Sequence, residues 1–263
     1  MSSDSPKRQV ESASLLLLYF DRSFKMQEWE DCEKSLGLPF HDKSLLKQAL
    51  THSSYINENT DSALPSSERL EFLGDAILGF IVAEELYRES PELPEGKLTT
   101  IRAFLVCRDA LAEVASSLKL GDYLLLGRGE EANEGRTKLS NLANAMEAVI
   151  GAMYWDQGLA KARRFVLGLL KPRLKRIKAG EVTPNYKALL QEFVQGKNKL
   201  TPVYQLVETT GPDHRRQFTV EVIVEDAVLG KGTGKNKKAA EMEAAHSAWV
   251  KLLGEGSLSH IHS

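Results

Sequence analysis

The hydrophobic period of the chain changes once, near residue 184. From Trp29 to about Leu170, apolar residues recur every three or four positions, which is the spacing of amphipathic helices. Beyond residue 184, three segments alternate between apolar and polar residues, as half-buried strands do, and a helical segment lies on each side of them. The pattern predicts an all-α domain followed by a small α+β domain of α-β-β-β-α order.

Segments rich in Gly, Pro, Asn, Asp and Ser separate the predicted elements. The helical segments of the first domain are expected at 44–56, 66–90, 95–106, 108–118, 139–156 and 159–176. Between 161 and 178 the chain carries eight basic residues and no acid. The predicted boundaries are an extension at 1–25, disordered or partly helical, the helical domain at 28–158, a basic helix and linker at 159–183, the α+β domain at 184–254, and a tail at 255–263.

Composition excludes few classes of function. A hydrophobic content of 42% and a charged content of 27% fit a soluble globular protein. The longest apolar run near the N-terminus, 15–20, is too short to cross a membrane. Cys32 and Cys107 lie far apart, without metal-ligand spacing, and are expected to be reduced thiols. We therefore expect a soluble, cytoplasmic protein with no membrane partner. The sequence contains no Gly-rich phosphate loop, so we expect no small-molecule cofactor.

One predicted helix combines apolar residues with clustered carboxylates. In "ERLEFLGDAILGFIV", residues 68–82, Glu68, Glu71 and Asp75 are three and four positions apart and share one helix face. Clustered carboxylates repel one another, and partial burial disfavours their charged form. A bound divalent cation reverses that preference, and Mg²⁺ prefers oxygen ligands of this kind. The spacing therefore indicates a magnesium site.

A second apolar helix is expected to complete the site. In "NLANAMEAVIGAMYW", residues 141–155, Asn144 and Glu147 share a face. The two helices also contain glycines, at positions 74, 79 and 151. Glycine destabilises a helix interior and indicates that another backbone comes close. We expect one metal site between these helices.

The acidic residues allow two other interpretations. Any single glutamate on such a face is most simply a solvated side chain. A carboxylate-bridged di-iron bundle would require Glu-x-x-His on two helices. The chain has this motif only at Glu243 and His246, in the second domain, so we reject the di-iron interpretation.

Three stretches of the second domain are suited to one long polyanion. The first is the opening helix, with Gln191 and Glu192, and the second is the loop 211–216, with His214, Arg215 and Arg216. The third is the start of the last helix, where a positive helix end favours phosphate; its basic residues are Lys235, Lys237 and Lys238. The middle strand lacks stacking aromatics, which argues against a reader of single strands and favours double-stranded RNA.

The motifs that carry these residues resemble bacterial ribonuclease III. The resemblance covers about residues 28–254. The endonuclease segments are "LLKQALTHSSYINE", "ERLEFLGDAIL", "PEGKLTTIRAFLV" and "GRTKLSNLANAMEAVIGAMYWD". Those of the double-stranded RNA-binding domain are "NYKALLQEFVQ", "GPDH" and "GKGTGKNKKAAEMEAA".

The resemblance implies a function and a set of site residues. It implies an endoribonuclease that cuts both strands of an RNA duplex as a homodimer and leaves 5′-phosphate and 3′-hydroxyl ends with two-nucleotide 3′ overhangs. The implied roles are rRNA, mRNA and tRNA processing, with Mg²⁺ as cofactor and Mn²⁺ as a substitute. The implied catalytic residues are Asp75 and Glu147. The metal ligands are Glu71, Asp75, Asn144 and Glu147, with Glu68 and Glu95 as supporting acids. The RNA contacts are Gln191, His214, Lys235, Lys237 and Lys238, and Phe72 is buried across the dimer interface.

One position departs from the family pattern. The second motif normally runs Asp-x-x-Glu, whereas this chain has Asn144-Ala-Met-Glu147. Asparagine keeps an oxygen ligand but loses a full charge, so cation affinity should fall. The alternative to the enzyme is therefore a weak or inactive protein that binds double-stranded RNA without cutting it. A third interpretation is an RNA-binding component of a large particle such as the ribosome.

Overall fold

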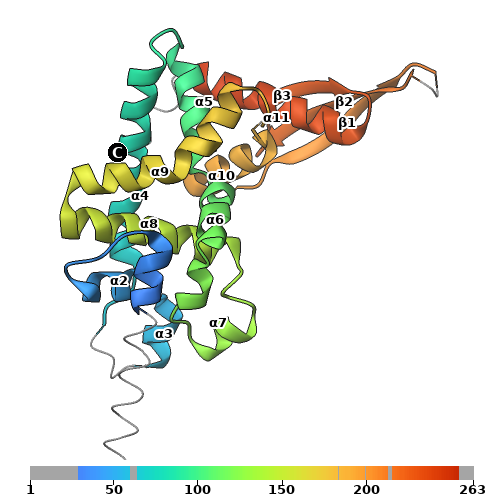
Figure 1. Cartoon of the computed structure of the whole chain (residues 1–263). Helices are drawn as coiled ribbons and strands as arrows, with labels where there is room; N and C mark the ends of the chain where they lie inside the picture. The colour runs from blue at the N-terminus through green and yellow to red at the C-terminus, as the bar shows by residue number, and fades with distance from the viewer. Residues whose placement is uncertain (1–28, 60–63, 183, 199, 213–214, 255–263) are drawn as a thin grey trace, which may run out of the picture. The chain divides into compact units, whose positions relative to one another are not determined.

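The computed structural model describes residues 29–59, 64–182, 184–198, 200–212 and 215–254 (Figure 1). The predicted extension at 1–25 and the tail at 255–263 lie outside these ranges. The chain forms two compact units, one containing residues up to 81 together with 108–169, and the other containing 82–107 together with the residues from 170 onward. None of the described helices is both long and apolar enough to cross a membrane.

The first unit is helical, as the sequence predicts. Residues 29–36 are helical. The elements that follow in this unit are α2 (Lys43–Ala49), α3 (Ser53–Glu58), the start of α4 (Glu68–Glu89), α6 (Arg108–Ser117), the 3-10 helix η1 (Leu120–Tyr123), α7 (Arg128–Ala132), α8 (Leu139–Gln157) and the start of α9 (Leu159–Lys178). The short elements η1 and α7 lie in a segment for which the sequence predicts no helix.

The predicted helix at 44–56 is two helices, so that prediction is wrong in one detail. The helix is interrupted at residues 50–52, where Thr51 forms a parallel bridge with Leu125. The Leu125 N–H donates to the Leu50 carbonyl at 2.8 Å, and the His52 N–H donates to the Leu125 carbonyl at 3.0 Å. The chain therefore satisfies these backbone groups from a distant loop and not from the helix itself.

The helix α8 forms the centre of the first unit. Between Asn141 and Met153, every residue except Asn144 and Glu147 is buried. The helix packs against α2 and α6. Because such a stretch is apolar on nearly all sides, its two accessible polar positions are the exceptions that require an explanation.

The glycines at 74 and 151 mark the crossing of α4 and α8. A Cβ built at Gly74 would fall on the carbonyl oxygen of Glu147, and one at Gly151 would fall on the carbonyl oxygen of Leu70. The expectation of a close backbone approach is confirmed at both positions. It is wrong at Gly79, where no described atom lies within 4 Å of such a Cβ.

The second unit contains the predicted α-β-β-β-α domain. Its elements are α10 (Tyr186–Asn198), β1 (Val203–Thr210), β2 (Gln217–Val224), β3 (Ala227–Gly234) and α11 (Lys237–Gly254), and the same unit includes α5 (Glu95–Val106). The strands form an antiparallel sheet in the order β1-β2-β3. The fold prediction is therefore confirmed for the described residues.

Small residues bring the last helix close to the sheet. A Cβ at Gly230, Gly232 or Gly234 would meet the backbone of α11 at Ala244, Ala240 or their neighbours. The alternating glycines of β3 therefore let α11 lie close against the sheet, and Figure 1 shows α11 beside the strands. The core between sheet and helices is apolar, and its buried residues include Leu190, Val194, Val220, Val222, Ala240, Ala244, Ala245 and Ala248.

Candidate metal centre and nucleic-acid interface

The carboxylates of α4 lie together, as the helical spacing predicts. Glu71 is half-buried, whereas Glu68 and Asp75 are exposed. Burial raises the pKa of the Glu71 carboxyl, and the charges of Glu68 and Asp75 raise it further. All three effects oppose the negative charge of the Glu71 carboxylate. A cation bound at this face would offset them.

The helix α8 adds oxygen atoms to the same region. Asn144 and Glu147 are the only residues between 141 and 153 that are not buried. The carbonyl of Glu147 packs against Gly74, which immediately precedes Asp75. The glycine crossing therefore brings the part of α8 that carries Glu147 against the part of α4 that carries Asp75.

A pocket of about 140 Å³ lies beside this crossing. We call it the acidic pocket. It is lined by Ala49, Leu50, His52, Ser53, Ser67, Glu68, Glu71, Leu124, Asn141, Asn144 and Ala145. The structure thus brings three of the predicted residues, Glu68, Glu71 and Asn144, into one pocket, whereas Asp75 and Glu147 are not part of its lining.

The donors fit an open magnesium site better than a closed metal site. Within the described ranges, no group of three or more His, Cys, Asp or Glu side chains converges so as to hold a metal ion by itself, and Glu71, Asp75 and Glu147 do not form such a group. Mg²⁺ differs, because it keeps several waters and is bound through one or two carboxylates together with substrate phosphates. The structure offers ligands of this kind. Glu71 and the Asn144 amide line one pocket, and Asp75 and Glu147 lie at the adjoining helix crossing.

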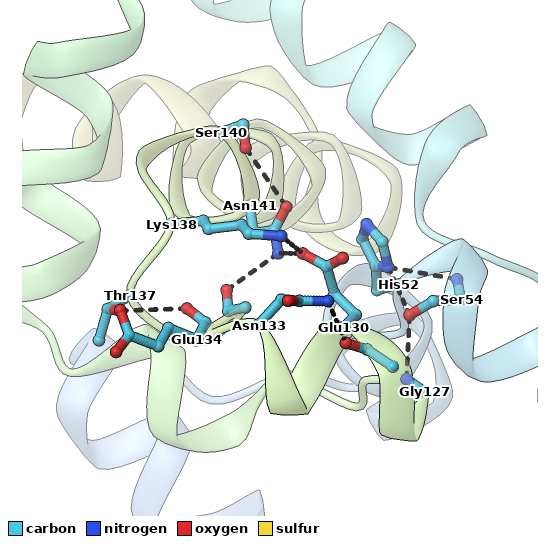
Figure 2. Close-up of polar contacts among 12 residues, drawn as sticks. His52, Ser54, Gly127, Glu130, Asn133, Glu134, Thr137, Lys138, Ser140 and Asn141 are labelled. Atoms are coloured by element: carbon cyan, nitrogen blue, oxygen red, sulfur yellow. Dashed lines mark hydrogen bonds and ion pairs between the residues drawn. The ribbon is translucent and has the colours of Figure 1, made fainter.

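Four polar residues of the acidic pocket were not predicted from the sequence: His52, Ser53, Ser67 and Asn141. Figure 2 shows how His52 and Asn141 are held. His52 caps α3, and its Nδ1 accepts a hydrogen bond from the Ser54 N–H at 3.2 Å. Asn141 Nδ2 donates to Glu130 Oε1 and to the Gly135 carbonyl, both at 2.9 Å. The one local signal was a histidine directly before the Ser-Ser pair that begins α3.

The predicted supporting acid Glu95 belongs to the second unit. It is the first residue of α5, it is exposed, and its Oε1 accepts a hydrogen bond from Thr99 Oγ1 at 2.9 Å. It is not among the residues that line the acidic pocket. Its supporting role stays a prediction.

The predicted interface residue Phe72 is 80% exposed, and Trp155 is 70% exposed. Such large apolar side chains in water are costly unless a partner covers them. The first unit also has a groove of about 300 Å³. We call it the apolar groove, and it is lined by Leu45, Gln48, Pro65, Arg69, Leu70, Leu73 and Trp155.

The basic residues of the second unit are accessible at the start of α11. Lys235, Lys237 and Lys238 are all exposed. The Asn236 side chain caps the helix, because its Oδ1 accepts a hydrogen bond from the Ala239 N–H at 2.8 Å. The positive end of this capped helix adds to the charge of the three lysines.

The other predicted RNA contacts lie on α10 and in the β1–β2 connection. Gln191 is exposed near the middle of α10. Arg215 and Arg216 are exposed just before β2. His214 lies outside the described residues.

Comparisons with known proteins place two domains along the chain, with the boundary between residues 174 and 186. Residues 42–174 match the family described as "Ribonuclease-III-like", and residues 186–252 match the "Double-stranded RNA binding motif". Ribonuclease 3 of Dehalococcoides mccartyi strain 195 is 46% identical over 223 residues, which is 85% of this chain and 94% of that protein. Ribonuclease 3 of Symbiobacterium thermophilum is 48% identical over 217 residues, which is 82% of this chain and 91% of that protein.

One solved structure has a similar helical unit. It is the nuclease domain of ribonuclease III from Campylobacter jejuni, described as having structural flexibility in a region involved in dimer formation. It is 41% identical, with a TM-score of 0.51, and the match covers 54% of this chain and 96% of that one.

Proposed function

The chain belongs to the ribonuclease III family, as an endoribonuclease domain followed by a double-stranded RNA-binding domain, and we propose that it cleaves double-stranded RNA with Mg²⁺ at the α4–α8 crossing. The observation that carries this proposal is the exposure pattern of α8. Asn144 and Glu147 are the two accessible residues of a buried stretch, and the helix meets acidic α4 at paired glycines.

The side chains have distinct parts in the proposed reaction. Glu71, Asp75 and Glu147 would hold the ion, and Asn144 would contribute an amide oxygen or orient a water. Mg²⁺ supplies an activated water and neutralises charge at the scissile phosphate when it is bound. Asp75 and Glu147, which flank the crossing, are the catalytic pair. Mn²⁺ has the same preference for oxygen ligands and should substitute.

The second domain delivers the substrate in this proposal. The exposed lysines at the start of α11 and Gln191 on α10 contact phosphates and 2′-hydroxyls of an A-form duplex. Two nuclease units in a homodimer each cut one strand and leave 5′-phosphate ends with two-nucleotide 3′ overhangs. The substrates we propose are cytoplasmic precursors of rRNA and mRNA.

The proposal is tested by incubating the purified protein with a long RNA duplex and with the matching single strand. We expect Mg²⁺-dependent cleavage of the duplex alone, to products that carry 5′-phosphates. Tight binding of the duplex, with no cleavage at any Mg²⁺ or Mn²⁺ concentration, would establish the binding-only alternative instead.

In this proposal, Asn144 determines the Mg²⁺ concentration that cleavage requires. The amide shares the acidic pocket with Glu71 but carries no charge, so Asn144→Asp should strengthen cation binding. We expect the variant to reach half-maximal cleavage at a several-fold lower Mg²⁺ concentration, with little change at saturating Mg²⁺. Titration of cleavage rate against Mg²⁺ measures this directly, and an unchanged or higher midpoint would remove Asn144 from the ligand set.

Phe72 is the proposed anchor of the homodimer. Its exposed ring is suited to the apolar groove of a second copy, which is lined by Trp155 among others. Phe72→Ala should remove about 2–4 kcal/mol of association free energy and shift the protein towards monomer at micromolar concentration. Phe72→Leu, which keeps an apolar anchor, should remain largely dimeric. Sedimentation velocity distinguishes the two, and an alanine variant that remains dimeric would place the interface elsewhere.

A further inference from the structure

The helix α9 carries positive charge that the proposed reaction does not use (Figure 1). Between Lys161 and Lys178 it has eight basic residues and no acid. Taking these eight from the 34 basic residues of the chain leaves 26 basic against 36 acidic residues, a net charge of −10. One helix therefore concentrates the positive charge of a chain that is otherwise acidic, as a surface that binds a polyanion does.

Helical spacing places four of these cations on one exposed face of α9. Counted from the first of them, the others follow at i+3, i+10 and i+14, which is one side of a helix. All four side chains are exposed, whereas Phe165 and Val166 on another side of the helix are buried. We call this set the cationic row, and its members are Lys161, Arg164, Lys171 and Lys175.

The cationic row is not neutralised by the protein itself. Within the described parts of the chain, no ion pair or hydrogen bond engages any of its four side chains. Other cations of α9 do have partners, because the Arg173 guanidinium lies 4.7 Å from the centre of the Phe104 ring, and Lys178 Nζ donates to the Glu89 carbonyl at 3.4 Å. Like charges three and four positions apart destabilise a helix, and an anionic partner would remove that cost.

A glycine lies in the middle of the cationic row. Gly168 is exposed, and beyond its own turns of helix no described atom lies within 4 Å of a Cβ built there. Glycine destabilises a helix interior, and no packing contact in the described chain requires it at this position. The missing side chain opens the helix backbone between Arg164 and Lys171 to a partner that approaches from outside.

The shape of the row favours a long and stiff polyanion. From Lys161 to Lys175 the helix rises about 21 Å, so the cations are spread along a line and do not converge on one small anion. The only aromatic residue of α9, Phe165, is buried, so the exposed face offers no ring on which unpaired bases could stack. This face also lacks the large apolar side chains with which a helix inserts into a membrane surface.

We propose that the cationic row of α9 is a further binding surface for double-stranded RNA, at which the four cations contact backbone phosphates of the substrate. The inference rests on the proposed function, since it concerns the same substrate. Phosphate contacts carry no sequence information, so the row raises the affinity for any duplex and helps to position it, without selecting a sequence.

The three lysines of the row can be changed without touching the metal centre. In the row-Gln variant all three become glutamine, which has a similar helix propensity, and in the row-Arg variant they become arginine, which keeps the charge. A remote control loses three positive charges at exposed positions outside α9. Its substitutions are Lys34→Gln, Lys43→Gln and Arg108→Gln.

Duplex affinity is measured by filter binding of the full chain without divalent metal, between 50 and 200 mM salt. The row-Gln variant should bind roughly 10-fold more weakly at physiological salt, and its slope of log affinity against log salt should be smaller by about 2–3, because each phosphate contact contributes about 0.9. The row-Arg variant and the remote control should bind within about two-fold of the wild type. All melting temperatures should agree within a few degrees, since the changed residues are exposed.

Single-turnover cleavage in Mg²⁺ separates binding from chemistry. At saturating duplex the row-Gln variant should cleave at the wild-type rate, whereas the RNA concentration for half-maximal rate should rise by the same factor as the binding constant. A lower rate at saturating duplex, with unchanged affinity, would mean that the row does not bind the substrate.

Two further results would overturn the inference. The first is a remote control that weakens duplex binding as much as the row-Gln variant does, because net charge alone would then explain the loss. The second is a row-Gln variant that keeps its duplex affinity but no longer binds vesicles containing phosphatidylserine, which would make a lipid surface the partner of the row. If the wild type binds duplex with a row-dependent salt slope but never cleaves it, the proposed function fails and the binding surface stands.

Discussion

Replacing Gly74 by alanine should destabilise the first unit by about 2–3 kcal/mol, whereas the same change at Gly79 in the same helix should not. A Cβ at Gly74 falls on the backbone carbonyl of Glu147, and backbone cannot rotate away as a side chain can. The helices α4 and α8 must therefore separate, and overpacking of this kind costs about 1–3 kcal/mol or more.

Gly79→Ala is the matched control. No described atom lies within 4 Å of its Cβ, so the change keeps the packing and gains helix propensity of about 0.5–1 kcal/mol. Urea unfolding of both variants, with amide exchange in α8 as a local probe, measures the difference. Equal urea midpoints for the two variants would mean that the backbones of α4 and α8 do not pack closely at Gly74.

Glu147→Gln should lower the rate of duplex cleavage roughly 10³-fold, because we propose that Glu147 holds an ion that supplies several kcal/mol of charge stabilisation. Duplex affinity should stay within about two-fold, since binding comes mainly from phosphate contacts made by basic side chains. Single-turnover cleavage and filter binding, at one salt concentration, give the two values.

The exposed Glu92 offers a control for the loss of one negative charge. Glu92→Gln leaves the acidic pocket and the crossing intact, so it should cleave at the wild-type rate. If Glu147→Gln cleaves as fast as Glu92→Gln, then Glu147 holds no ion that matters to the reaction.

The sequence predicts much of the fold because the hydrophobic periods are strong. The predicted helix at 95–106 matches α5, and the change of period near residue 184 gives the α-β-β-β-α order. The break between α2 and α3 was not predictable from local sequence. It depends on a backbone bridge to Leu125, far along the chain.

The candidate site was predictable only in part. The spacing of Glu68, Glu71 and Asp75 on α4, and of Asn144 and Glu147 on α8, identifies the acidic face, since helical geometry is local. Local sequence cannot distinguish Gly74, which packs against α8, from Gly79, which does not. His52 was missed because its place in the pocket depends on a backbone hydrogen bond to Leu125, which lies far along the chain.

The most direct measurement of the central claim is the position of a bound metal ion. Crystals of the protein soaked in Mn²⁺ should show an anomalous peak within coordination distance of the oxygens of Glu71 on α4 and Glu147 on α8. The peak should vanish in Glu147→Gln crystals. A wild-type protein that cleaves duplex RNA with Mn²⁺, while its peak lies away from both helices or is absent, would contradict the account.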